Sequence, residues 1–256
     1  MRYESFQQLI DTMDSVGYDY KKEILEIEKK KQAFLSESVG GLGLTEHIRT
    51  MVYAQLSNNR PWEPIVANID KIDEIFGGFD LDFINNTEPH IFVEEIRKIR
   101  CGNRQIKRQM FCLRDNIKTL QRIALDHGSI DNYYHNENLG VVIKNLSDSS
   151  GKYKLKYLGV PLVCEYLKGL GIEVVKPDTL LCRILGRLGY SSKIPASHWE
   201  AIEICRQIGD EYHISQTMVD TVLWQYCAAG KFEVCVAKPK CELCKVTCCK
   251  YNKGGL

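Results

Sequence analysis

The stretch from Leu158 to Gly189 constrains the fold of this chain more than any other. It contains two apolar helical patterns joined by a tight turn at Gly159-Val160-Pro161. A short glycine-containing hairpin between helices can aim backbone N–H groups at an anion such as a phosphate. Further along, Lys176-Pro177-Asp178 stands immediately before another helical pattern, where Asp178 can either cap the helix or stabilise a cation. The stretch therefore predicts an anion-binding helical hairpin followed by a carboxylate at a helix start.

The rest of the chain carries helical rather than strand periodicity. Apolar residues recur at helical spacing within 1–38, 45–56, 62–76, 91–125, 138–146 and 195–229. A strand-like run, EVV before Lys176, is too short to build a sheet. We expect an all-α protein, whose 256 residues are enough to bury a core in one large domain or in two lobes.

The charges give a local signal rather than a global one. The net charge of +1, from 34 Lys and Arg against 33 Asp and Glu, argues neither for nor against a nucleic-acid partner. From Arg97 to Arg122, however, nine Lys or Arg residues accompany a single acid, Asp115. A phosphate backbone fits such a stripe, and a solvated helix face is the competing interpretation.

No apolar run approaches the length of a membrane span, and the N-terminus is too polar for a signal peptide. We therefore expect a cytoplasmic protein without a membrane partner, associated with the nucleoid if it is bacterial.

The 11 cysteines are unevenly placed. Six are scattered through helical patterns, where small buried side chains are the simplest interpretation. The other five lie between 235 and 249, and such crowding in a reducing compartment favours a metal over disulfides. Four thiolates at short spacing can hold a [4Fe–4S] cluster or a tetrahedral Zn²⁺, and the spacing alone leaves both open.

Taken together, the hairpin Leu158-Gly159-Val160, Gly171, and Pro177-Asp178-Thr179 with Arg183 resemble the helix-hairpin-helix and Gly/Pro-Asp signature of DNA base-excision glycosylases typified by endonuclease III. Where the family hairpin usually carries a second glycine, this chain has Pro161. The resemblance implies a monomer that binds double-stranded DNA containing a damaged or modified base.

The same resemblance implies two helical lobes. One would span 46–174, a six-helix-type lobe that ends in the hairpin. The other would combine 1–45 with 175–256 and carry the catalytic Asp and a C-terminal cluster loop at 230–250. A flipped base would lie in the cleft between them.

Family positions also imply site residues. Asp178 would be catalytic, stabilising the positive charge that develops on the sugar. DNA would be contacted by the hairpin and by a residue that fills the gap left by the flipped nucleotide: Leu158, Gly159, Val160, Pro161, Leu162 and Asn59. The base pocket would contain Tyr53, Gln55, Asp220 and Trp224. A plain Asn-rich helix cap at Asn59, and a surface Asp with a core Trp at 220 and 224, are the ordinary alternatives.

Family members that also cut the DNA backbone use a lysine on the helix after the hairpin, and here that place falls at Val163 or Cys164. We therefore expect a monofunctional glycosylase that uses water as nucleophile. Three rivals are a catalytically inactive DNA-binding module, a bifunctional glycosylase and lyase, and a metal-stabilised helical protein without a DNA role.

The cysteine-rich tail resembles the C-terminal [4Fe–4S] loop of the endonuclease III-like enzymes, with each outer gap one residue shorter. On that resemblance we choose Cys235, Cys241, Cys244 and Cys249 as metal ligands, with Cys248 as the alternative fourth ligand. A [4Fe–4S] cluster is the expected cofactor and Zn²⁺ the alternative.

Overall fold

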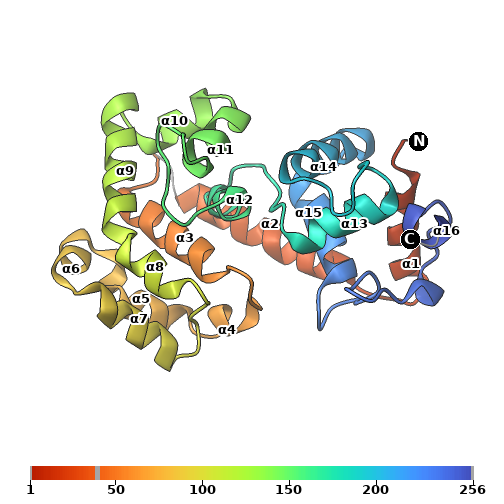
Figure 1. Ribbon diagram of the computed structural model, residues 1–256, viewed down its shortest axis with the longest axis horizontal. Helices are drawn as coiled ribbons and strands as arrows, with labels where there is room; N and C mark the ends of the chain where they lie inside the picture. The colour runs from red at the N-terminus through yellow and green to blue at the C-terminus, as the bar shows by residue number, and fades with distance from the viewer. Residues whose placement is uncertain (1, 38–40, 255–256) are drawn as a thin grey trace. The chain divides into compact units, whose positions relative to one another are not determined.

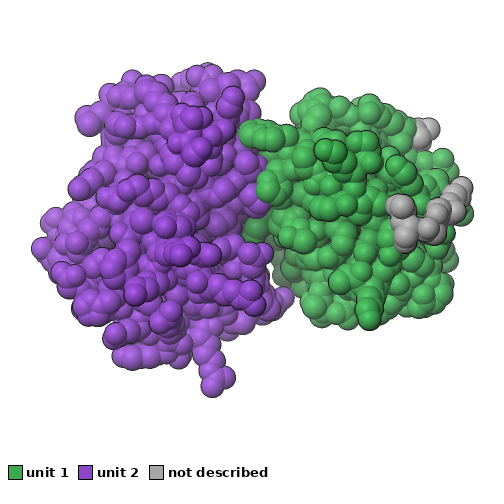
Figure 2. Space-filling model, in the orientation of Figure 1, with its two compact units in different colours: residues 1–37, 171–256 green, residues 38–170 purple. Residues whose placement is uncertain are grey.

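A computed structural model describes residues 2–37 and 41–254, which form helices and connecting loops without a β-strand (Figure 1). This confirms the prediction of an all-α protein. Within those residues, no helix has both the length and the apolar character needed to span a bilayer. The chain divides into two compact units, 38–170 and 1–37 with 171–256, coloured separately in Figure 2. The predicted boundaries, after 45 and after 174, lie a few residues further along the chain.

The unit formed by 38–170 contains ten of the α-helices and one 3₁₀ turn. In chain order they are α3 (Leu44–Leu56), α4 (Glu63–Val66), α5 (Ile69–Ile75), η1 (Gly77–Phe79), α6 (Leu81–Asn86), α7 (Pro89–Lys98), α8 (Ile106–Phe111), α9 (Leu113–His127), α10 (Ile130–Asn136), α11 (Leu139–Ser147) and α12 (Val160–Gly169).

The helical segment 91–125 consists of three helices, α7, α8 and α9, and the gap between the first two contains Cys101-Gly102-Asn103. Asn103 explains the break between α7 and α8, because its Oδ1 accepts from the backbone N of Gln105 at 2.7 Å while its Nδ2 donates to the carbonyl of Gln55 at 2.8 Å. A side chain that satisfies its own backbone competes with the helical ladder. The connection between α7 and α8 is therefore held against α3 by a contact between distant segments, which hydrophobic periodicity cannot reveal.

Aromatic stacking and a close helix pair organise this unit. The rings of Phe76, Phe79 and Phe92 are buried, and the centroid of Phe76 lies 5.1 Å from that of Phe79 and 4.8 Å from that of Phe92. α3 packs directly on α12, where a Cβ on Gly169 would stand 2.5 Å from Cγ2 of Thr50. Glycine at this point lets the helix that follows the hairpin approach α3 closely.

The unit formed by 1–37 and 171–256 contains α1 (Glu4–Asp14), α2 (Tyr20–Glu37), α13 (Thr179–Leu188), α14 (His198–Tyr212), α15 (Gln216–Cys227), η2 (Cys241–Leu243) and α16 (Lys250–Gly254). α13, α14 and α15 pack on one another, and apolar side chains of α1 complete their core. A reciprocal capping box between Ser197 and Glu200 starts α14.

From 228 to 249 this unit continues as a loop with a single 3₁₀ turn. α1 supports this loop through two hydrogen bonds. Oε1 of Gln8 accepts from the backbone N of Thr247 at 2.9 Å, and Oγ1 of Thr12 accepts from the backbone N of Lys245 at 3.2 Å. The N-terminal helix is thus a structural support for the cysteine-rich segment.

Candidate functional site

The predicted hairpin lies between α11 and α12. Leu158 is fully buried, whereas Gly159 is exposed and caps α12 in an extended conformation. The Gly159 carbonyl accepts from the backbone N of Leu162 and of Val163, each at 3.0 Å. Pro161 is the second residue of α12, where a helix tolerates the missing N–H. Replacing a glycine by proline therefore keeps the helix start intact and removes one N–H that could face an anion.

Lys154 stabilises the hairpin through hydrogen bonds to backbone carbonyls. Its Nζ donates to the carbonyl of Ser147 at 2.8 Å and to that of Leu158 at 2.6 Å. The side chain is half-buried, and burial lowers the pKa of its ammonium group. The residue before the hairpin is thereby tied to the end of α11, and the hydrogen bonds hold the ammonium group in place.

Asp178 begins α13, as the sequence predicted for a capping residue. Its Oδ1 accepts from the backbone N of Leu180 at 2.8 Å and from that of Leu181 at 3.1 Å. The residue is half-buried. Burial, followed by the negative charge of Asp178, raises the pKa of Cys182 to about 12. The carboxylate is thus held in one orientation by the helix that it caps, and its second oxygen takes no part in the cap.

Asn59 is exposed in the loop after α3 and has a φ of 50°, in the left-handed region. Asparagine tolerates this conformation better than most residues. Its Nδ2 donates to Oδ1 of Asn58 at 3.2 Å. The side chain predicted to fill a gap in DNA therefore stands at an exposed loop tip.

The four predicted base-pocket residues lie on two helices in different units. On α3, Gln55 is fully buried and its carboxamide has no hydrogen-bond partner among the described residues, while the Tyr53 hydroxyl donates to Oδ1 of Asp73 at 2.6 Å. On α15, Asp220 is 8% exposed and Trp224 is half-buried, with Nζ of Lys231 lying 5.3 Å from the indole centroid. That these residues share one pocket remains a prediction.

The basic segment 97–122 divides between two roles. Arg114 donates to the carbonyls of Ile84 and Thr87, and Arg122 donates to the carbonyl of Lys152, so both hold the unit together. Other cations of the segment are exposed, among them Arg104, Lys107 and Arg108 on and before α8. Only part of the stripe is therefore available to a phosphate backbone.

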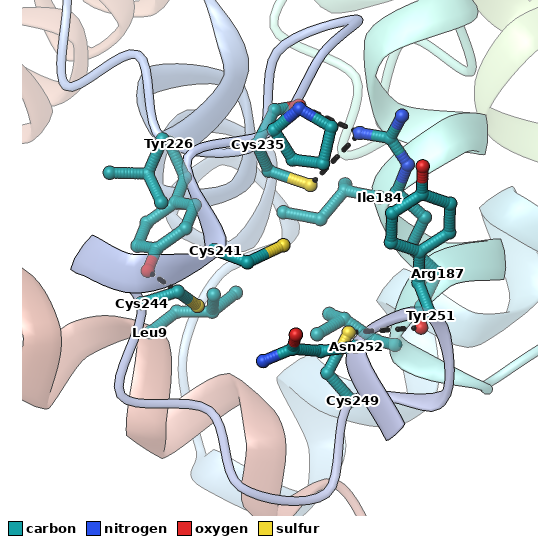
Figure 3. Close-up of a pocket in the computed structure, with 13 residues that line it drawn as sticks. Leu9, Ile184, Arg187, Tyr226, Cys235, Cys241, Cys244, Cys249, Tyr251 and Asn252 are labelled. Carbon is teal, nitrogen blue, oxygen red and sulfur yellow. Dashed lines mark hydrogen bonds between the residues drawn. The ribbon is translucent and has the colours of Figure 1, made fainter. Parts of the chain in front are cut away.

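Four of the five tail cysteines surround one pocket. Cys235, Cys241, Cys244 and Cys249 line this pocket, and Figure 3 shows their sulfurs on different sides of it. Cys248 is exposed, outside the lining, with its Sγ 3.7 Å from Oε1 of Gln8. The structure thus gathers the preferred ligand set and leaves the alternative fourth ligand out.

Arg187, on the last turn of α13, forms one wall of the pocket and is only 5% exposed. Its guanidinium donates to the carbonyls of Val236 at 2.7 Å and Ala237 at 2.9 Å, and Nη1 lies 3.5 Å from Sγ of Cys235. The ring of Tyr251 faces it at 4.7 Å (Figure 3). None of these partners is a carboxylate. Because a buried cation is costly without a nearby anion, the pocket suits a negatively charged ligand set.

The thiols differ in their surroundings. Hydrogen bonds from Cys227 and from Arg187 lower the pKa of Cys235 to about 6, against the opposing effect of burial. The Tyr226 hydroxyl donates to Sγ of Cys244 at 3.1 Å. Burial, in contrast, raises the pKa of Cys241 and of Cys249. The donors that favour a thiolate thus face Cys235 and Cys244.

Sequence reasoning missed several residues of this pocket. Leu9 of α1 lines it, although the N-terminal helix had no assigned role, and Arg187 and Tyr226 read only as parts of helical patterns. For Arg187 the available signal was a charged residue that, together with Arg183, interrupts the apolar run of α13.

Neither a protein-family model nor a curated protein matches the chain. A search of solved structures finds the crystal structure of the 8-oxoguanine DNA glycosylase of Methanocaldococcus jannaschii (MjOgg), with a TM-score of 0.60. The two chains are 18% identical, and the match covers 88% of this chain and 94% of that one. The fold expected from the hairpin and Pro177-Asp178 is supported at this level: the chain shares the fold of that 8-oxoguanine DNA glycosylase.

Proposed function

We propose that this protein is a DNA glycosylase of base excision repair, which flips a damaged or modified base out of duplex DNA and hydrolyses its N-glycosidic bond. The carrying observation is Asp178, a half-buried carboxylate fixed at the start of α13 directly after the helical hairpin. The structural likeness to MjOgg over most of both chains supports the same assignment.

The chemistry follows from the carboxylate. Cleavage of the N-glycosidic bond builds oxocarbenium character on the sugar, so a negative charge held close to C1′ lowers the barrier. The hydrogen bonds from Leu180 and Leu181 to Oδ1 hold the side chain without reorganisation during the reaction. The second oxygen is left to face the cation and to orient the water that attacks C1′.

Hydrolysis without strand cleavage is the finer part of the proposal. A lyase step needs an amine that attacks C1′, and the two positions that match the family lysine, Val163 and Cys164, are both fully buried. Lys154, on the other side of the hairpin, is engaged with two carbonyls. These observations favour water over an amine as the nucleophile.

We also propose that Cys235, Cys241, Cys244 and Cys249 hold a [4Fe–4S] cluster. Among residues 2–37 and 41–254, no three Cys, His, Asp or Glu side chains are grouped closely enough to hold a metal ion, so the choice rests on the chemistry of the lining and Zn²⁺ is the alternative. Thiols spread around a space, beside the buried charge of Arg187, fit a larger anionic group. Such a cluster supplies cross-links between the loop and its walls. Iron, sulfide and zinc analysis with a visible spectrum of anaerobically purified protein tests this choice.

The base is proposed from the structural neighbour, which is an 8-oxoguanine DNA glycosylase. An 8-oxoguanine duplex is therefore the first substrate to test, followed by alkylated, mismatched and otherwise modified bases. Tyr53, Gln55, Asp220 and Trp224 are the proposed pocket residues, and Leu158–Leu162 with Asn59 the proposed DNA contacts.

The deciding experiment measures abasic-site formation on a panel of duplexes, each with one altered base, by the wild type and by Asp178→Asn. Release of one base by the wild type alone supports the proposal. Binding of an altered duplex without base release by either protein supports the rival, an inactive DNA-binding module, for which Pro161 in the hairpin is the favouring observation. Failure to bind any duplex at low salt, where phosphate contacts are strongest, overturns both.

A further inference from the structure

Tyr226 reaches the cysteine pocket from the inside of the fold. It lies on α15, its side chain is fully buried, and its hydroxyl donates to Sγ of Cys244 at 3.1 Å. Figure 3 shows the hydroxyl pointing at the sulfur across the pocket wall. The proposed glycosylase reaction does not use this hydroxyl. A side chain that served only to pack the core would not need it.

The contact differs in kind from the others in the pocket. Arg187 binds two backbone carbonyls in addition to Cys235, so its guanidinium has a structural task in shaping the loop. The ring of Tyr226 packs against Phe232 at a centroid distance of 5.2 Å, so its position is set by apolar contacts. The hydroxyl, which also has Thr12 as a hydrogen-bond partner, can therefore be removed without removing the apolar contacts of the ring.

A hydrogen bond to a metal-bound thiolate withdraws electron density from the sulfur. It stabilises the more negative, reduced state of an iron–sulfur cluster more than the oxidised state, and so raises the reduction potential. The effect is strengthened by burial, because the surrounding dielectric is low. Tyr226 has both properties, since it is an O–H donor and is shielded from water.

We propose that Tyr226 tunes the cluster site by donating a hydrogen bond to the Cys244 thiolate, which makes one-electron reduction of the cluster easier. This inference rests on the proposed [4Fe–4S] site but is independent of the base that the enzyme removes. Tyr226 is a positioning and tuning residue rather than a catalytic one.

The test compares the full-length wild type with Tyr226→Phe and with a matched control, Tyr212→Phe. Tyr212 lies in the same unit, away from the pocket cysteines. Its substitution by Phe also removes one hydrogen bond, which its hydroxyl donates to the carbonyl of Tyr3 at 3.0 Å. Each protein is purified anaerobically, its iron and sulfide are measured, and the midpoint potential is determined with dithionite as the one-electron reductant. The expected result is full iron content in all three and a more negative potential for Tyr226→Phe alone.

A second variant covers the case in which Tyr226→Phe fails to load iron. Incorporation of 3-fluorotyrosine at 226 keeps the size of the side chain and makes its hydroxyl a stronger donor, so the potential is expected to become less negative. Iron-loaded protein whose potential is unchanged by either substitution overturns the inference and leaves the cluster standing. Protein that contains zinc or no metal overturns the cluster and the inference together, while the base-release assay judges the glycosylase proposal separately.

Discussion

The observed role of Asp178 as a helix cap and its proposed role as a catalytic anion can be separated by substitution. Asparagine caps a helix about as well as aspartate does, and its side-chain oxygen can accept the same hydrogen bonds from Leu180 and Leu181. Asp178→Asn therefore removes the charge and keeps the cap. Asp178→Ala removes both.

The magnitudes follow from the geometry. A carboxylate about 4 Å from a unit positive charge, at an effective dielectric constant of about 20, stabilises it by about 4 kcal/mol. That corresponds to a factor of about 10³ in rate. Loss of the cap in Asp178→Ala costs about 1 kcal/mol, or about 2–4 °C in Tm for a chain of this size.

The assay pairs single-turnover base release with thermal unfolding. We expect both variants to lose activity by about 10³-fold, while only Asp178→Ala loses stability. Asp80→Asn is the matched control, since Asp80 caps α6 by accepting from the backbone N of Phe83 at 2.8 Å in the other unit. It should change neither property. Base release by Asp178→Asn at the wild-type rate would refute the catalytic role and leave Asp178 a cap only.

Three further predictions concern the pocket, the nucleophile and the packing of α13. Cys241→Ser should abolish iron binding, whereas Cys248→Ser should retain it, because only the first lines the pocket; equal iron content in the two variants would contradict the ligand choice. Borohydride treatment of wild-type protein with substrate DNA should trap no covalent adduct, and a shifted band on a denaturing gel would indicate a lysine nucleophile. Gly186→Ala should destabilise the protein by about 1–3 kcal/mol in denaturant unfolding, because its Cβ would stand 2.6 Å from the carbonyl of Lys193.

Much of the fold could be predicted from local patterns. Helical periodicity and glycine turns indicated an all-α chain, and the hairpin with Asp178 identified the fold before any coordinates. The break between α7 and α8 could be predicted at Cys101-Gly102-Asn103, but its attachment to α3 could not, because that depends on Asn103 reaching the carbonyl of Gln55, a contact between distant segments. Periodicity reports which face of a helix is buried and is silent about which partner covers it.

The candidate site likewise contains residues that the sequence pattern identified and residues that it did not. Close spacing marked the tail cysteines, and the chain order of the hairpin and Asp178 marked the proposed catalytic residue. The roles of Arg187 and α1 could not be predicted, because they arise only when the cysteine-rich tail packs against them. The hydrogen bond between Gln8 and Thr247 is one such contact. The sequence shows the charge of Arg187 within a largely apolar helix, but the burial of its side chain is known only from the structure.

The placement of the pocket offers a physical reason for the proposed metal ligands in the proposed glycosylase, whose bond-breaking step would need no metal. The segment 228–249 has a single 3₁₀ turn, and loops of this length without regular structure are uncommon in compact domains. α13 connects it to the chemistry, since Asp178 caps one end of this helix and Arg187 binds the loop from the other. Ligands that fix the loop would therefore also fix the far end of the helix that Asp178 starts. On this argument, removal of the metal should loosen the loop and the end of α13 first, and hydrogen exchange that increased equally throughout the unit would contradict it.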